Sequence, residues 1–356
     1  MIRLLTIPML ALLVGGQVKA QKGFTMLSPS IVTVQGNIEH HISDAIYIRY
    51  IKDFVTFDTI TADSTTVSKR GNFELSFNWT EPAAAFLVYG NHTMPLFLSP
   101  GDNLMLNFIG REFKKTMDYC QGENQANNYL KIKNLEENRQ AALQSRDKFP
   151  DSRSFRHFAD SMMQDELSLL ESHVDQFEHW TPGVEAFVDY ERAQIKFFWI
   201  NEKLNYRLEE IISEQDEVVA REDRKYYSFL SDVAINDPTA TASPSYYIFL
   251  DSYINFLRRR LVASKPNFNS LSSERVDYEI IGNELVDRHR SVMLARTVLS
   301  SFGEADRTSA DMLLTRFKEE ETGSPELVKI LDVAYQRSLD RKTSGEPRSD
   351  TATSGL

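Results

Sequence analysis

The sequence predicts an α+β protein, in which an N-terminal antiparallel β-sandwich or barrel is followed by an all-α helical bundle. Two observations predict this class. Between residues 30 and 109, apolar and polar side chains alternate, which is the period of half-buried strands. After residue 122, apolar residues recur at spacings of three and four, which is the period of an amphipathic helix.

The length of 356 residues allows two domains, and a hydrophobic content of 42% allows each to bury a core. We expect a signal peptide at residues 1–20, a linker at 21–29, a β-domain at 30–120, a helical domain at 121–340 and a disordered tail at 341–356. The tail is rich in Ser, Thr, Gly and charged residues, a composition that does not bury a core.

The first 20 residues have the pattern of a secretory signal. Arg3 gives a basic start, an apolar run spans residues 4–14, and Val18-Lys19-Ala20 resembles a peptidase site, so we expect cleavage before Gln21. No Cys follows the apolar run, which disfavours a lipoprotein. The sequence therefore predicts export to the periplasm or cell surface, with no transmembrane segment in the mature chain. An uncleaved N-terminal anchor is the alternative.

The charge of the chain excludes one class of partner. The net charge is −11, and removal of Arg3 and Lys19 with the signal leaves 38 Lys and Arg against 51 Asp and Glu, a charge of −13. A chain this acidic is repelled by phosphate backbones. We therefore expect no nucleic-acid partner.

The β-domain should contain at least six short strands. Turn signals precede two of them: residues 69–72 contain Gly71, and Ser99-Pro100-Gly101-Asp102 has the Pro and Gly of a type II turn. The predicted strands lie at residues 45–51, 54–60, 73–77, 84–89, 95–99 and 104–108.

The helical domain begins with a polar stretch at 123–148, which we expect to be a long exposed helix. An apolar stripe then continues to Phe177, and Pro325 is well placed for the first turn of the last helix. The further predicted helices lie at residues 163–177, 184–212, 226–234, 245–263, 273–290, 291–302, 309–321 and 325–339.

Two groups of residues could bind a metal ion, and in both we favour a structural role. His40 and His41 with Asp44 would lie on a strand, where adjacent side chains point to opposite faces. In the second group, His173, Asp175 and His179 lie at a helix end, where Asp175 and His179 could share a face, but a third ligand would have to come from elsewhere and none is evident. We therefore expect no metal and no cofactor.

The sequence offers no recognisable catalytic motif. Cys120 is the one cysteine, so a Cys-x-x-Cys pair is absent and a small packed residue is the favoured interpretation. Acidic runs such as Glu209-Glu210 and Glu319-Glu320-Glu321 are typical of solvated helix faces. The plentiful aromatic residues predict core packing, with a groove for a peptide or glycan as the alternative.

The order of several short motifs resembles one family, the exported thioredoxin-family thiol–disulfide oxidoreductases of Bacteroidetes, of the TlpA type. The resemblance covers the region that precedes their thioredoxin domain, here about residues 30–340. The motifs that carry it are Gly36-Asn37-Ile38, Gly71-Asn72-Phe73, Leu96-Phe97-Leu98-Ser99-Pro100-Gly101-Asp102, Asn127-Asn128-Tyr129-Leu130, Asn236-Asp237-Pro238 and Ser243-Pro244.

The resemblance implies a small β-domain and a helical segment, but the family's catalytic dithiol has no counterpart here. The sequence ends at Leu356, about where that domain should begin, and we interpret the chain as a member without the redox module. We expect a non-catalytic exported binding or scaffolding protein rather than an enzyme. The alternatives are an accessory that docks a separate thioredoxin-like protein and, third, an unrecognised hydrolase.

Replacing Ala20 with Arg should block signal cleavage, because a signal peptidase needs a small residue there. N-terminal sequencing of the exported wild-type protein should begin at Gln21, whereas Ala20→Arg should keep its apolar start. Lys22→Ala, beyond the site, is the control and should be processed normally. A mature wild-type chain that begins elsewhere would contradict the assignment.

Overall fold

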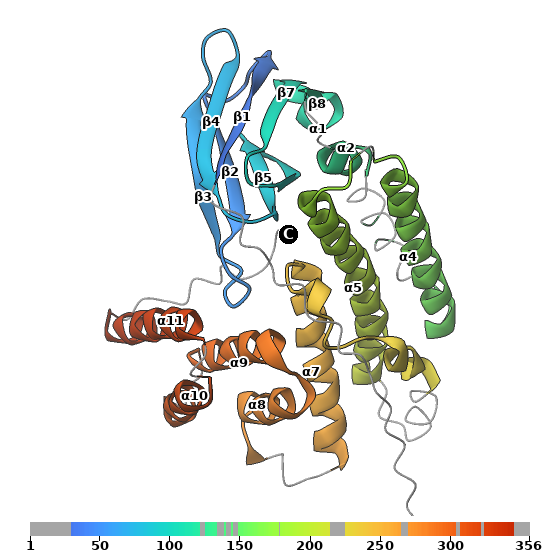
Figure 1. Ribbon diagram of the computed structural model, residues 1–356. Helices are drawn as coiled ribbons and strands as arrows, with labels where there is room; N and C mark the ends of the chain where they lie inside the picture. The colour runs from blue at the N-terminus through green and yellow to red at the C-terminus, as the bar shows by residue number, and fades with distance from the viewer. Residues whose placement is uncertain are drawn as a thin grey trace, which may run out of the picture.

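The predicted α+β class is confirmed by the computed structural model (Figure 1). The structure describes residues 30–121, 125–133, 139, 144, 149–177, 179–213, 225–264, 270–303, 307–321 and 324–344. The predicted signal peptide, the linker and most of the tail lie outside these ranges. All the described strands lie in the first range, which also contains two short helical turns, and the longer helices lie in the ranges that follow. None of the helices in the described ranges is long and apolar enough to cross a membrane.

Eight strands form two four-stranded sheets, which pack face to face as an open sandwich. Sheet A has the order β4-β1-β7-β8 and sheet B the order β3-β2-β5-β6. The strands are β1 Ser30–Glu39, β2 Ala45–Ile51, β3 Thr59–Thr66, β4 Asn72–Trp79, β5 Ala83–Tyr89, β6 His92–Leu98, β7 Asn103–Ile109 and β8 Asp118–Gln121.

The alternation seen in the sequence determines which side chains fill the sandwich. In β4 every second residue is buried, from Phe73 to Trp79, and the residues between them are exposed. The indole Nε1 of Trp79 donates to the carbonyl oxygen of Leu98 at 3.1 Å, which joins sheet A to sheet B inside the core. After β7, the chain forms a short 3-10 turn, η1 Gly110–Glu112, and the helix α1 Phe113–Thr116. This helix contacts β6 and β7.

Both predicted turns are present. Gly101 has a φ of +88°, and the Asp102 amide donates to the Ser99 carbonyl at 3.1 Å, as a type II turn requires. Gly71 has a φ of +84°, and its amide donates to the Ser68 carbonyl at 2.8 Å. Glycine suits both positions because it adopts positive φ without a steric penalty.

Two details of the predicted sheet are corrected. The strand expected at 54–60 instead begins at Thr59, because Phe54, Val55 and Phe57 leave the sheet and pack into the helical core. The sheets are also not wholly antiparallel, since β1 pairs with β7 in parallel along Thr33–Glu39 and Asn103–Ile109. The long crossover through sheet B, between these two strands, allows that direction.

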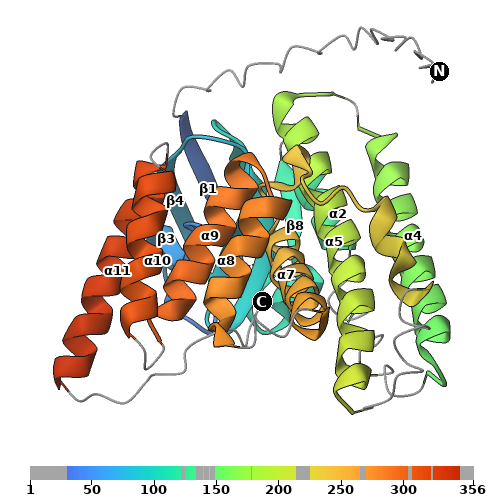
Figure 2. The same ribbon diagram turned by 90° about the horizontal axis from the view of Figure 1, so that it is seen from below.

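One group of helices lies to the right of the sheets in Figure 1, and another lies below them and in front of the strands in Figure 2. A first group contacts β6, and a second group contacts the tip of the β2–β3 hairpin. The first group is α2 Gln125–Ile132, α4 Ser152–Val174 and α5 Pro182–Ser213. The second is η3 Tyr227–Asp232, η4 Pro238–Ala240, α7 Pro244–Ser264, α8 Ser273–Glu284, α9 Asp287–Ser301, α10 Arg307–Glu320 and α11 Pro325–Ser344.

The helix predicted at 123–148 is less exposed than expected where the structure describes it. Within residues 123–148, the continuous helix that the structure describes is α2. Most of the other residues of this stretch lie outside the described ranges. Four of the eight residues of α2 are buried, including Tyr129, whose ring packs edge-on against His173 and Phe187. The polar composition of the stretch concealed this buried face.

The side chain of Asn127 in α2 completes the edge of sheet B. Its Oδ1 accepts from the Phe97 amide at 2.8 Å, and its Nδ2 donates to the Phe97 carbonyl at 2.9 Å. A buried strand edge without partners would leave such groups unsatisfied, at a cost of about 1–3 kcal/mol each. Asn127 therefore takes the place of a neighbouring strand and attaches the first helical group to the sandwich.

Arg296 of α9 holds the tip of the β2–β3 hairpin. Its guanidinium donates to the carbonyl oxygens of Phe54 at 2.9 Å and Val55 at 3.1 Å, lies over the Phe57 ring and pairs with Asp251 of α7. The second helical group is thus attached to the β-domain by carbonyl hydrogen bonds and apolar burial together.

The helix predicted at 273–290 is divided, which corrects that boundary. Leu285 and Val286 are extended, and Asp287 has a φ of +50°. Asn236 fills the gap, because its Nδ2 donates to the Glu284 carbonyl and its Oδ1 accepts from the Val286 amide, both at 3.0 Å. The 226–234 segment also differs, since it forms the 3-10 helix η3 instead of an α-helix.

Replacing Gly36 with Ala should destabilise the protein by about 3 kcal/mol, because overpacking next to a fixed backbone cannot relax. A Cβ at Gly36 would lie 1.7 Å from the Leu106 carbonyl oxygen of β7. Gly282→Ala is the matched control, since its Cβ would meet no atom within 4 Å and Ala favours helix by about 1 kcal/mol. Urea unfolding measures both, and similar effects would contradict the tight β1–β7 approach.

Candidate functional site

The histidine groups singled out in the sequence do not converge on a metal site. His40 lies in a turn after β1 with a φ of +49°, and both it and His41 are exposed. The prediction that His40 and His41 lie on a strand is therefore wrong. Within the described ranges, no three His, Cys, Asp or Glu side chains are arranged to hold a metal ion.

The second group lies at the end of α4, as expected. The Nδ1 of His173 is 2.9 Å from the Leu169 carbonyl oxygen, and its ring contacts Tyr129. Asp175 is the C-cap of the helix, and His179 is exposed in the following loop. These residues therefore end a helix and pack it against α2.

The remaining reactive candidates are Cys120 and the two acidic runs. Cys120 belongs to β8, and the surroundings of its side chain lie outside what is described, as do those of Glu209 and Glu210. In the run that ends α10, Glu319 and Glu320 are exposed, but Glu321 is half-buried. The prediction of a solvated face is therefore wrong for Glu321, which contacts α9.

The aromatic residues fill the cores, as expected. Phe197 and Trp199 are fully buried on α5, in two different hydrophobic clusters. Tyr246 and Tyr247 of α7 are also fully buried, and Phe54 of the hairpin tip stacks on Tyr247 with ring centroids 4.7 Å apart. These rings join elements and do not line an open groove.

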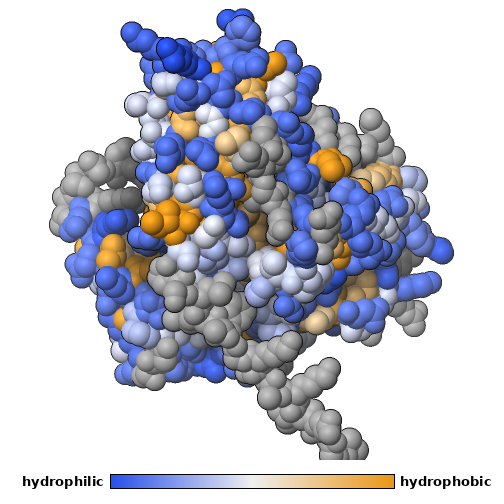
Figure 3. Space-filling view, turned by 45° about the horizontal axis from the view of Figure 1, so that its top comes forward, coloured by the Kyte–Doolittle hydropathy of each residue, from blue (hydrophilic) through white to orange (hydrophobic). Residues whose placement is uncertain are grey.

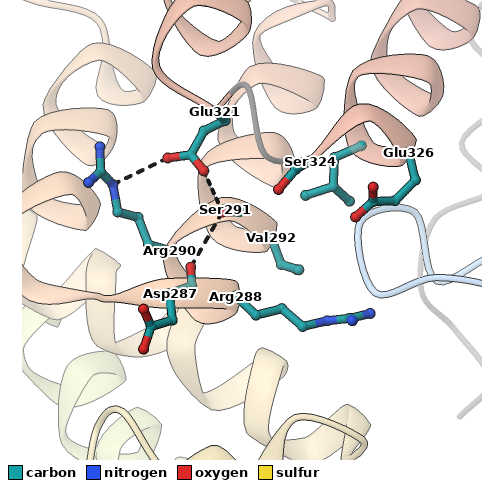
Figure 4. A pocket seen from close by; sticks show the side chains of 9 residues that line it. Asp287, Arg288, Arg290, Ser291, Val292, Glu321, Ser324 and Glu326 are labelled. Carbon is teal, nitrogen blue, oxygen red and sulfur yellow. Dashed lines mark hydrogen bonds and ion pairs between the residues drawn. The ribbon is translucent and has the colours of Figure 1, made fainter. Parts of the chain in front are cut away.

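A pocket of about 450 Å³ lies between the start of α9 and the start of α11 (Figure 4). In α9, the Nε of Arg290 forms an ion pair with Glu321 Oε1 at 3.4 Å. The neighbouring Ser291 hydroxyl donates a hydrogen bond to Glu321 Oε2. Arg288 extends away from this pair toward the β-domain hairpin in Figure 4. Arg290, Ser291 and Glu321 therefore join α9 to the end of α10 at one side of the pocket.

Charged side chains are also buried between α2, α4 and α5. Glu166 is 4% exposed and accepts from Arg139 and from the Trp199 indole, the latter at 3.0 Å. Lys133 pairs with Glu191, which is 2% exposed. Burial, reinforced by Arg139, lowers the pKa of the Lys133 amine well below its usual value. Each buried charge has a partner, as a structural ion-pair cluster requires.

The outer surface of sheet A carries the candidate site, which we call the polar face. It is a hollow of about 520 Å³ across β7, β1 and β4 and the end of β3. Its central residue is Gln35 of β1, which lies between Glu74 of β4 and Met105 of β7. The other side chains on this face belong to Asn37, Thr65, Thr66, Asn72 and Asn107.

Hydrogen bonds organise one end of the polar face. The side-chain Nδ2 of Asn37 donates to Asn72 Oδ1 at 2.8 Å. The backbone N–H of Asn37 donates to Asn107 Oδ1 at 3.1 Å. The side chains of Gln35 and Glu74 make no hydrogen bond or ion pair within the described ranges, although their backbones pair in the β1–β4 ladder. The ordered side-chain amides therefore lie beside the side chains of Gln35 and Glu74, which have no hydrogen-bond partner among the described residues.

The sequence contained part of this site. Alternation along β4 and β7 predicted that Asn72, Glu74 and Asn107 face away from the core. It did not predict that β1 lies between those strands, because the parallel pairing with β7 joins residues about 70 positions apart. The run Gln35-Gly36-Asn37 in the middle of β1, which places two amide side chains on one face of the strand, is the signal that could have indicated the centre of the site.

The exposed apolar side chains do not gather into one patch on the face seen in Figure 3. On the face seen in Figure 3, hydrophobic residues are scattered as separate spots among hydrophilic ones. The exposed large apolar residues come from different elements, for example Ile31 of β1, Ile132 of α2 and Val333 of α11. Single exposed apolar side chains of this kind are normal on a protein surface.

Comparison with models of protein families, with curated proteins and with solved structures found no match.

Replacing Glu166 with Gln should cost about 3–5 kcal/mol of stability, because it leaves the charge of Arg139 without a partner in a buried position. Glu171→Gln on the same helix is the control. Its ion pair with Arg192 is half exposed, so its loss should cost less than about 1 kcal/mol. Urea unfolding measures both, and equal effects would contradict a structural role for the buried pair.

Proposed function

We propose that this chain is a non-catalytic, exported binding protein related to the N-terminal region of TlpA-type thioredoxin-family proteins, and that the polar face is its binding surface. The observation that carries the proposal is the hollow centred on Gln35, in which amide and hydroxyl groups are held open to solvent beside Glu74. The secretory pattern of residues 1–20 supports export.

The chemistry of the face supports binding over reaction. Amide groups donate and accept hydrogen bonds but do not exchange protons near neutral pH. Glu74 is the one ionisable group among the described residues that line the hollow. General acid–base catalysis of hydrolysis ordinarily uses two positioned carboxyl groups, as glycosidases do. The hydrolase alternative therefore gains no support from this face.

The two attachments between the β-domain and the helices support a scaffolding role. Asn127 attaches α2 to β6, and Arg296 attaches α9 to the β2–β3 hairpin. Two separated contacts restrict rotation of one part against the other more than either would alone. The polar face would then be presented on a stable platform.

Capture from an extract of the exported proteins and polysaccharides of the producing bacterium tests the proposal. The mature chain should retain a specific component, and the double variant Gln35→Arg/Asn107→Arg should lose it, because two cations would obstruct the hollow. Gln164→Arg, on the exposed surface of α4, is the control and should retain the component. Retention by all three proteins would contradict the polar face as the binding surface.

The same experiment addresses the accessory alternative. If the retained component is a thioredoxin-like protein, the chain docks a separate oxidoreductase, as the family resemblance suggests. Insulin reduction by that component should then change when the mature chain is added. A free, monomeric chain that retains nothing would contradict both roles.

A further inference from the structure

We infer that the ligand of the polar face is a neutral oligosaccharide. This inference rests on the proposed function, since it names the ligand class for the same surface. Sugar hydroxyls are both donors and acceptors, and they need partners of both kinds at close spacing. Asn72 adds an amide donor, and Asn37 offers its Oδ1 as an acceptor, because both hydrogens of its Nδ2 are already donated to the Arg70 carbonyl and to Asn72 Oδ1. Asn107, Thr65 and Thr66 contribute further amide and hydroxyl groups to the lining.

The geometry of the hollow fits a flat, extended ligand. Gln35 lies between Glu74 and Met105, and Asn37 lies between Asn72 and Asn107, so polar groups form two neighbouring rows across three strands. The volume of about 520 Å³ lies within the range of about 300–1,000 Å³ typical of small-molecule sites.

Preorganisation distinguishes this face from an ordinary polar surface. The Asn37 side chain is fixed by the Arg70 carbonyl at 2.9 Å as well as by Asn72. Amides that are already ordered lose little conformational freedom when a ligand binds. Met105, half-buried beside Gln35, offers an apolar surface for the C–H face of a sugar ring.

Charge selects a neutral sugar over an acidic one. Neither Lys nor Arg is among the described residues that line the hollow, and Glu74 contributes a negative charge there. The whole chain carries a net charge of −11, which repels anionic ligands at longer range. Sulfated or uronic-acid glycans should therefore bind poorly.

An extended peptide fits the site less well. Peptides that add to a sheet use the free backbone of an edge strand. At β4, the edge nearest the hollow, the Ser76 amide already donates to Asp63 Oδ2 at 2.8 Å. The face offers side chains from strand interiors, and Met105 is its main apolar anchor.

Isothermal titration of the mature chain tests the inference with four probes: maltohexaose, cellohexaose, mannohexaose and, as the acidic comparison, a galacturonic acid hexamer. At least one neutral probe should bind, and the acidic one should bind at least about tenfold more weakly. Gln35→Leu should weaken the neutral complex about tenfold or more, because it replaces the central amide with an apolar group of similar size.

Two controls isolate the site. Gln164→Leu on α4 should leave the affinity unchanged, and Glu74→Gln should reduce the discrimination against the acidic hexamer by removing the negative charge. Circular dichroism should confirm that Gln35→Leu is folded. We expect this because the Gln35 side chain makes no hydrogen bond within the described ranges, so its replacement breaks none.

The outcomes separate the ligand class from the proposed function. If no neutral hexamer binds at millimolar concentration, but the chain retains a protein that Gln35→Arg/Asn107→Arg releases, the oligosaccharide inference is wrong and the binding function remains. Binding of a neutral hexamer that Gln35→Leu leaves unaffected overturns the site. If neither sugars nor proteins depend on this face, both proposals are wrong.

Discussion

The arrangement of this protein depends on how backbone groups that lack a neighbouring strand or a continuing helix are satisfied. Two asparagine side chains meet that need. Asn127 hydrogen-bonds both backbone groups of Phe97 at the edge of β6, and Asn236 bridges Glu284 and Val286 where α8 ends. An amide carries a donor and an acceptor at the spacing of a peptide group, so one side chain can replace a missing stretch of backbone.

This constraint also determines which surfaces remain open. The β6 edge is occupied by α2, and the tip of the β2–β3 hairpin is buried against α7 and α9. Asp63 of β3 accepts the Ser76 amide, so the edges of β3 and β4 face each other across the seam of the sandwich. The outer surface of sheet A, around Gln35, keeps its exposure because the helices attach elsewhere.

The buried ion pairs and the polar face differ in the kind of polar group they contain. Buried charges, such as Glu166 with Arg139, lie in pairs between helices, where removing one member is costly. The polar face instead has mostly uncharged groups, which lose less hydration energy when a ligand covers them. This contrast in composition is the basis on which we proposed a neutral ligand for the polar face.

The sequence by itself determined the α+β class, the turn at Gly101 and the start of the last helix at Pro325, because periodicity and turn chemistry depend on residues close together in the chain. Only the tertiary structure decided that β1 runs parallel to β7, that the segment around Val55 leaves its sheet for the helical core, and that Asn236 divides α8 from α9. Each of these depends on partners many residues away, which local patterns do not specify. The polar face has both origins, since alternation directed its side chains outward and strand pairing placed them side by side.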